Sequence, residues 1–145
     1  MKALIQRVSS ASVEVEGRIV GQIKKGILVF IGIEKQDELE HADKMINKVL
    51  SYRVFSDTEG KMNLSVSDIS GGVLLVPQFT LAAETSNGTR AGFSTAKPPL
   101  DAENIYNHMV RRAKDLSSNV ESGIFAADMK VALVNDGPVT FLLKC

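Results

Sequence analysis

Apolar and polar residues alternate along the chain with two different periods, and each period predicts a different kind of element. A period of two over residues 12–16 predicts a half-buried strand, and the continuous apolar run at 27–33 predicts a fully buried one. By the same reasoning the other strands are predicted at 2–8, 19–23, 73–76, 125–133 and 139–143. Most predicted strands follow one another directly, so hairpins should predominate over strict alternation of strands and helices.

Two stretches show the helical period instead. Apolar residues at helical spacing predict a helix over 37–52, with Asp37 as its N-cap, and a second helix over 101–116. Residues 85–99 have no periodicity and contain two glycines and two prolines, which is typical of a functional or mobile loop. Together these elements predict a single-domain α+β fold, with two helices and a largely antiparallel or mixed sheet that curls toward a barrel.

Length and composition restrict the classes of protein to consider. The 145 residues suffice for one domain with a core, and 44% hydrophobic with 23% charged residues is typical of a globular chain. Seventeen basic residues balance seventeen acidic ones. This balance argues against a protein that binds along long stretches of nucleic acid, but it is compatible with one that binds only the end of a nucleic acid. With Cys145 as its only cysteine and no apolar run near the ~18 residues of a membrane span, the chain is expected to be cytoplasmic.

The familiar signatures of metal sites and catalytic sites are missing from the sequence. His41 and His108 stand without a second ligand at HxxxH or HxH spacing, so no metal site is predicted. Cys145 has no histidine near it in sequence and is not predicted to be a nucleophile. No phosphate-binding glycine loop and no GxSxG motif occurs. Any chemistry is therefore expected at residues that break local structural rules.

The segment 77–81 is the first such place. Pro77 ends one of the most apolar strands, and Gln78 and Thr80 then place an amide and a hydroxyl beside it, where burial without partners is costly. A threonine nucleophile needs an adjacent base, and none is near Thr80 in sequence. Where a strand ends at a proline, the following backbone amides, here of Phe79 and Thr80, can point into a cleft as an oxyanion hole.

The segment 135–140, NDGPVT, is the second such place. Asn, Asp, Gly and Pro together are turn residues, and one interpretation is a tight hairpin turn. The other interpretation is a binding element, because a Gly-Pro bond adopts the cis form at modest cost. A cis bond between Gly137 and Pro138 would turn two carbonyls the same way and make a rigid acceptor pair for an ammonium group. The residues alone leave both interpretations open.

The motifs PQFTLAAET and NDGPVT together resemble the paired signatures SQFTL and NxGPVT of the D-aminoacyl-tRNA deacylases, also called D-tyrosyl-tRNA deacylases. The segments ALIQRV, FSDTEGKMNLSV and GIFAADM are similar too, so the resemblance spans essentially the whole chain at unshifted spacing. It implies hydrolysis of D-aminoacyl-tRNA, and of glycyl-tRNA mischarged on tRNA-Ala, without cofactor or metal. The implied partners are the 3′ end of the tRNA and a second copy of the chain, in a homodimer with shared active sites.

The resemblance also implies roles for individual residues. The matching positions are Gln78, Phe79 and Thr80 for catalysis, and Gly137, Pro138, Arg7, Phe125 and Met129 for substrate binding. Gly137 and Pro138 are expected to enter the other subunit's pocket, to hold the substrate's amino group and to exclude L-side chains sterically, with Arg7 bracing them. Phe125 and Met129 are expected to line an adenosine pocket, and their alternative is ordinary packing on a strand face.

One departure from the family pattern keeps two other functions open. Pro77 stands where the family has serine, so that serine cannot be essential if the chain is active. A related class, which removes L-alanine from mischarged tRNA, starts its motif with proline (PQATL) and carries NGPYT with a trans Gly-Pro. Phe79 and NDGPVT follow the D-specific pattern instead. The third hypothesis is a binding module that keeps the pocket and has lost its chemistry through Pro77.

Overall fold

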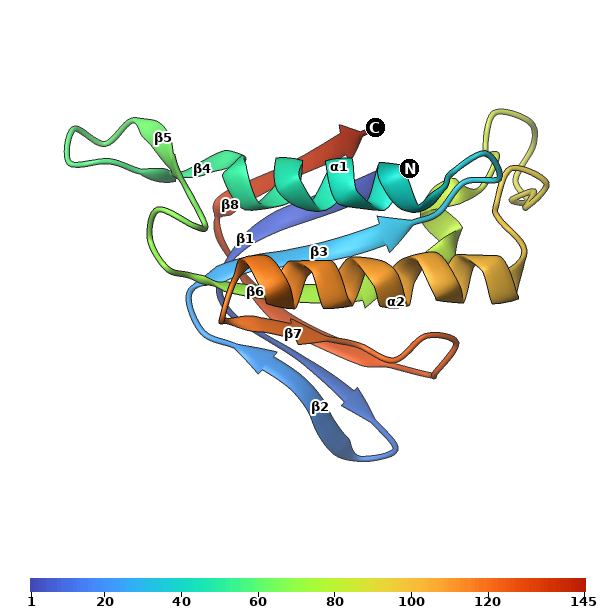
Figure 1. Cartoon of the computed structure of the whole chain (residues 1–145), viewed down its shortest axis with the longest axis horizontal. Helices are drawn as coiled ribbons and strands as arrows, with labels where there is room; N and C mark the ends of the chain where they lie inside the picture. Colours follow the sequence, from blue (N-terminus) through green and yellow to red (C-terminus); the bar gives the residue numbers. More distant parts are fainter.

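The computed structural model describes the whole chain, residues 1–145. Its strands are β1 (Lys2–Val15), β2 (Arg18–Ile23), β3 (Gly26–Gly32), β4 (Arg53–Ser56), β5 (Met62–Ser65), β6 (Gly72–Pro77), β7 (Val120–Ser122) and β8 (Lys130–Lys144). Its helices are α1 (Leu39–Ser51), α2 (Pro99–Leu116) and a short 3-10 helix, η1 (Phe79–Ala82). Two helices and a mixed sheet confirm the predicted α+β fold (Figure 1).

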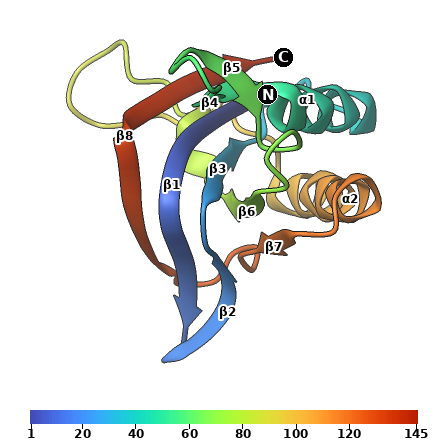
Figure 2. The same ribbon diagram turned by 90° about the vertical axis from the view of Figure 1, so that its left-hand side faces the viewer.

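Six of the strands form one curved sheet. Its order is β2-β1-β3-β6-β7, and β8 pairs with the other edge of β1. The pairs that involve β1 are antiparallel, whereas β3 and β7 both lie parallel to β6. Figure 2 shows the sheet bending between β8 and β7, with α1 and α2 side by side on one of its faces. The strands β4 and β5 form a separate hairpin.

Apolar side chains are buried on both faces of this sheet. The larger cluster lies between the sheet and the two helices and includes Ile5, Val29, Leu75 and Met109. A smaller cluster, formed by Val8, Ala11, Val13, Ile23, Leu28, Leu74 and Val76, lies on the opposite face. Because β3 and β6 are buried on both sides, their sequences are continuous apolar runs rather than alternating ones.

The strands differ from the predicted ones in several places, and the hairpin strands β4 and β5 were not predicted at all. The segments 2–8 and 12–16 join into one 14-residue strand, β1, since no glycine or proline separates them and β8 pairs with both halves. The three-residue strand β7 was not predicted, because it is too short to show a period. The alternation at 125–133 predicted a strand from Phe125, but β8 begins at Lys130. Ala126 has a φ of 60°, so the chain turns there.

The predicted break at Gly137-Pro138 is also wrong, because β8 continues through it to Lys144. Gln6 of β1 faces Thr140 while Val8 faces Asn135, so residues 136–139 bulge out opposite one residue of β1. The segment is therefore a bulge within a strand and not a hairpin turn. The peptide bond between Gly137 and Pro138 is cis in this structure.

Both helices begin at other residues than predicted. The N-cap of α1 is Glu38 and not Asp37, whose buried carboxylate binds the α-ammonium of Met1 instead. The second helix begins at Pro99, since proline is well suited to the first turn. Residues 83–98 are irregular, as predicted, apart from isolated bridges. Neither helix has the length and apolar character that crossing a membrane requires.

Candidate active site

A cavity of about 530 Å³ opens where β3 and β6 end. Eleven of its 15 lining residues are hydrophobic, so its walls are mainly apolar with few polar groups. Five residues singled out in the sequence line it, namely Pro77, Gln78, Phe79, Phe125 and Met129. An apolar concave site with a few polar groups at one side is the usual form of a small-ligand pocket.

The end of β6 forms one side of the cavity. Pro77 faces Ile31 of β3, and the Gln78 N–H donates to the Ile31 carbonyl at 2.7 Å, which fixes the direction of the chain. The 3-10 helix then begins at once, with the Leu81 N–H donating to the Gln78 carbonyl at 3.1 Å. The N–H groups of Phe79 and Thr80 are its first two and have no acceptor within the chain. The rim thus carries two free backbone donors.

The side chains of this rim are arranged differently from those of a nucleophilic site. The Gln78 amide donates to the Thr80 hydroxyl at 2.5 Å, and no basic side chain contacts that hydroxyl. Phe79 is 60% exposed, and its ring stacks at a tilt on Phe93, with 5.1 Å between the ring centroids. Without a neighbouring base Thr80 is not activated for attack. The donors of this rim, rather than its side chains, are suited to stabilise an anion.

A second side of the cavity comes from the turn between β7 and β8. The Gly123 N–H donates to the Leu75 carbonyl at 2.8 Å, and a Cβ on Gly123 would lie 2.7 Å from the Met129 sulfur. Beneath it the buried Tyr106 hydroxyl lies 2.9 Å from the Leu75 carbonyl and 3.2 Å from that of Gly123. Burial raises the pKa of Tyr106, so this phenol stays neutral. These contacts place Phe125 and Met129 at the cavity.

The bulge of β8, residues 135–140, is held by its own set of hydrogen bonds. The Asn135 side chain accepts from the Val139 N–H at 2.7 Å and donates to the Thr140 hydroxyl at 3.0 Å. Arg7 donates through Nε to the Asp136 carbonyl at 2.8 Å and through Nη1 to the Val54 carbonyl at 2.7 Å. The sequence analysis marked the segment 135–140 but gave Asn135 no role of its own, although asparagine in a turn segment is a signal for local side-chain to backbone bonds.

The structure therefore separates the expected site residues into two groups. Gln78, Phe79, Phe125 and Met129 line the cavity and Thr80 adjoins it, while Arg7, Gly137 and Pro138 do not line it. Arg7 faces Ile27 of β3, four residues before Ile31 at the cavity, a distance of about 13 Å along the strand. Gly137 and Pro138 are exposed. Within one chain, the bulge and the cavity are thus two distinct features.

Comparison with known proteins identifies the family. The family model for D-Tyr-tRNA(Tyr) deacylase matches residues 4–144. Proteins named D-aminoacyl-tRNA deacylase from Saccharophagus degradans and Pseudomonas fluorescens are 59% and 56% identical, each over 99% of both chains. A solved structure titled "c-Myc DNA Unwinding Element Binding Protein" superimposes with a TM-score of 0.95 at 38% identity, covering 100% of this chain and 99% of that one. The chain belongs to the D-Tyr-tRNA(Tyr) deacylase family.

Proposed function

We propose that this protein hydrolyses the ester bond between a D-amino acid and the 3′ end of a tRNA, in the cytoplasm, and releases both. Glycine attached to tRNA-Ala is a second expected substrate, since it has no side chain to be excluded. The observation that carries the proposal is the pair of free Phe79 and Thr80 amides at the rim of an apolar cavity, in a chain of this family. Such donors fit an ester carbonyl that develops negative charge.

The proposed reaction needs position and donors rather than a side-chain base. The terminal adenosine occupies the cavity against Phe125 and Met129, and Gln78 holds the ribose end or the shape of the rim. A water molecule, assisted by the ribose 2′-hydroxyl, adds to the ester carbonyl carbon while the Phe79 and Thr80 amides stabilise the oxyanion. The bond from that carbon to the 3′ oxygen then breaks, and the 3′ oxygen takes a proton. The products are the free D-amino acid and the tRNA.

The selectivity is proposed to arise in a homodimer with shared sites. Gly137 and Pro138 of one copy enter the cavity of the other, where their carbonyls hold the amino group and leave no room for an L-side chain. Two observations support this arrangement: the bulge is exposed, and it does not line the cavity of its own chain. In addition β8 is an edge strand that exposes Val134 and Leu142, as a surface that pairs with a second copy does.

Two other functions remain as alternatives. Pro77 matches the class that clears L-alanine from tRNA, although Phe79 and the NDGPVT segment match the D-specific class. A binding module without catalysis is favoured by Pro77 in the serine position and by the DNA-binding title of the 38%-identical solved structure. Both alternatives make predictions that differ from ours for the same set of substrates.

The test compares four substrates: D-Tyr-tRNA, L-Tyr-tRNA, L-Ala-tRNA on a non-cognate tRNA, and Gly-tRNA-Ala. We expect rapid release of D-tyrosine and of glycine, with L-Tyr-tRNA left intact. Equal hydrolysis of the two tyrosyl substrates would contradict chiral selection. Faster loss of L-Ala-tRNA than of D-Tyr-tRNA would support the L-alanyl class, and binding of a D-aminoacyl-adenosine analogue without turnover would support the binding module.

Mixing two inactive variants tests the shared site. Asn135→Ala damages only the bulge, and Phe125→Asp, which places a carboxylate in the apolar wall, damages only the cavity. If each site combines the cavity of one copy with the bulge of the other, random mixed dimers restore about a quarter of the wild-type activity. A mixture that stays as inactive as its components would place each complete site within one chain.

A further inference from the structure

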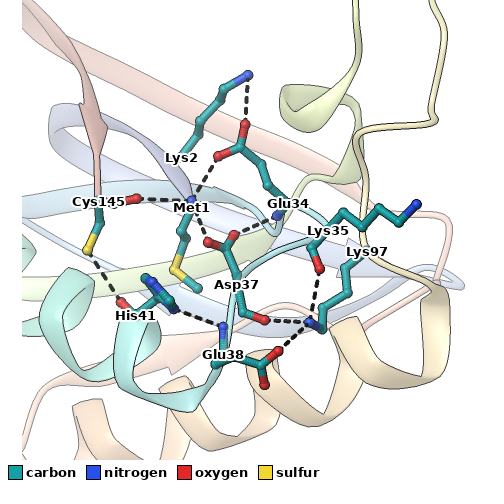
Figure 3. Close-up of polar contacts among 9 residues, drawn as sticks. All are labelled: Met1, Lys2, Glu34, Lys35, Asp37, Glu38, His41, Lys97 and Cys145. Carbon is teal, nitrogen blue, oxygen red and sulfur yellow. Dashed lines mark hydrogen bonds and ion pairs between the residues drawn. The ribbon is translucent and has the colours of Figure 1, made fainter.

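Lys97 is the only charged residue among those that line the cavity, and its charge is directed away from it. Its ammonium donates to the carbonyl of Asp37, to that of Lys35 at 3.3 Å and to the Glu38 carboxylate at 3.2 Å (Figure 3). The side chain is only 9% exposed. The aliphatic part of Lys97 thus forms part of the cavity wall, while its ammonium binds to the segment 34–38, which follows β3.

Asp37 is the centre of that segment. It is 4% exposed, and its two carboxylate oxygens have different partners. One accepts from the α-ammonium of Met1 at 2.7 Å and the other from the Glu34 N–H at 2.6 Å (Figure 3). A buried carboxylate is stable only when it is paired with a cation and hydrogen-bonded, as this one is. Its carbonyl is at the same time an acceptor for Lys97.

Backbone hydrogen bonds tie the same two segments together. The Lys97 N–H donates to the Ile33 carbonyl at 3.1 Å, and the Lys35 N–H donates to the Thr95 carbonyl at 2.8 Å. Ile33, Ala96 and Pro99 line the cavity. The part of the wall formed by Ile33, Ala96 and Pro99 therefore has its position set by contacts that converge on Asp37, a residue that does not itself line the cavity.

We propose that Asp37 and Lys97 are positioning residues for the cavity: the Met1–Asp37 ion pair fixes the segment 34–38, and Lys97 transmits that position to the wall. Neither residue touches the reacting ester. The consequence for substrate affinity rests on the function proposed above, whereas the consequence for the order of the wall does not. Positioning predicts a loss of substrate binding with little change in the chemical step, because the rim at Phe79 and Thr80 is left in place.

Asp37→Asn is the sharpest variant. An asparagine has the same shape but only one side-chain oxygen, while the Met1 ammonium and the Glu34 N–H both require an acceptor. We expect the KM for D-Tyr-tRNA to rise about tenfold while kcat changes less than about twofold. Amide hydrogen exchange of residues 95–102 should become faster, although these residues are distant from position 37 in sequence.

Two further variants separate positioning from general damage. Lys97→Met keeps an apolar stem in the wall and removes the ammonium, so it should give the same pattern as Asp37→Asn. The double variant should then be no worse than either single one, because both break the same connection. Glu38→Gln is the matched control: it removes a carboxylate from the same ammonium, but the Glu38 side chain is 69% exposed, and we expect no change.

Several results would overturn the proposal. It fails if exchange at 95–102 is unchanged in Asp37→Asn or Lys97→Met, or if the effects of the two substitutions simply add. A fall in kcat with constant KM would also contradict it. If the wild-type protein does not hydrolyse D-Tyr-tRNA, the proposed function fails, and the exchange measurements still decide whether Asp37 orders the wall.

Discussion

The cavity and the bulge of β8 are built in opposite ways. The cavity has apolar walls and two backbone donors without acceptors, so its rim is chemically unsatisfied. The bulge has its polar groups paired through Asn135 and Arg7, yet it lies on the exposed surface and encloses nothing. The first offers space and donors, and the second offers a fixed shape. Each supplies what the other lacks, and this complementarity is the reason why we propose that two copies combine in one site.

This difference also predicts how each region responds to substitution. The shape of the bulge depends on a few specific contacts, so a single change there should have a large effect. The cavity walls depend on many dispersion contacts, which are individually weak, so single changes there should have graded effects.

Gly137→Ala should have the largest effect. Gly137 has a φ of 143°, and a Cβ there would lie 2.7 Å from Val139 Cγ2 and 3.0 Å from Arg7 Nη2. The variant should lose about 1–3 kcal/mol of stability in a denaturant titration, as residues in such backbone regions do. Because misplacement by about 1 Å can cost a factor of about 100 in rate, hydrolysis of D-Tyr-tRNA should fall by about that factor.

Gly17→Ala is the matched control for that substitution. Gly17 also has a positive φ, 77°, but a Cβ there would meet nothing within 4 Å. It lies in the turn between β1 and β2, away from the residues that line the cavity. We expect a stability loss of about 1–2 kcal/mol from the left-handed conformation alone and no loss of activity. Equal losses of activity in both variants would show that the bulge has no special role.

Arg7→Met should have an intermediate effect. It removes the hydrogen bonds to the Asp136 and Val54 carbonyls and keeps much of the side-chain volume. Leaving the partly buried Val54 carbonyl unpaired should cost about 1–3 kcal/mol in thermal unfolding. Deacylation should fall about tenfold, with a measurable gain of activity on L-Tyr-tRNA as the bulge loosens. Arg18→Met, at an exposed position of β2, should change neither quantity.

The pH dependence of stability should show a smaller effect, from the Met1 ion pair. Burial acts to lower the pKa of the Met1 α-amine, but its hydrogen bonds to Asp37 and Glu34 outweigh burial and raise it. The ion pair therefore contributes fully to stability below about pH 8, which is the ordinary pKa of an α-amino group. This contribution is lost as the pH rises through the pKa of the folded state.

At acidic pH the same network loses stability as the pH falls rather than as it rises. Burial alone would raise the pKa of Glu34, but the Met1 ammonium and Lys2 lower it, so its contribution is lost as the pH falls below about 4. The melting temperature should therefore show a plateau between about pH 5 and pH 8. In Asp37→Asn the alkaline decline should be shallower than in the wild type. Identical alkaline slopes would show that the pair contributes nothing.

Periodicity predicted those parts of the fold that local sequence determines. The helical stripes and the apolar runs at 27–33 and 73–76 correspond to α1, α2, β3 and β6, since burial on one or two faces leaves a direct pattern. Alternation failed at Phe125, because residues in a turn can alternate in burial without forming a strand. Asp37 was misplaced as an N-cap because its partner, the Met1 ammonium, is distant in sequence.

The candidate site shows the same division. A proline at the end of an apolar strand breaks a local structural rule, and Pro77 thereby marked a segment that lines the cavity in the structure. The residue pattern by itself did not predict the separation of the bulge from the cavity, which only the family resemblance implied, because this separation depends on how β1 aligns with β3 and with β8. The position of Lys97 in the cavity wall could not be predicted from the sequence either. It depends on three oxygen atoms that accept hydrogen bonds from its ammonium, and they belong to a segment without a recognisable motif.

Pro77→Ser should have the smallest effect, and it tests whether the rim works through backbone donors alone. The serine restores a hydroxyl beside the cavity, while Pro77→Ala gives the same loss of the ring without one. Both variants should lose about 0.4–1 kcal/mol of stability, because proline restricts the unfolded chain. If the Phe79 and Thr80 amides carry the electrostatic work, hydrolysis of D-Tyr-tRNA by the two variants should agree within about threefold. A serine variant about 100-fold faster than the alanine variant would instead show that a side-chain hydroxyl at this position takes part in the chemistry, a contribution of the size that one oxyanion-hole donor makes.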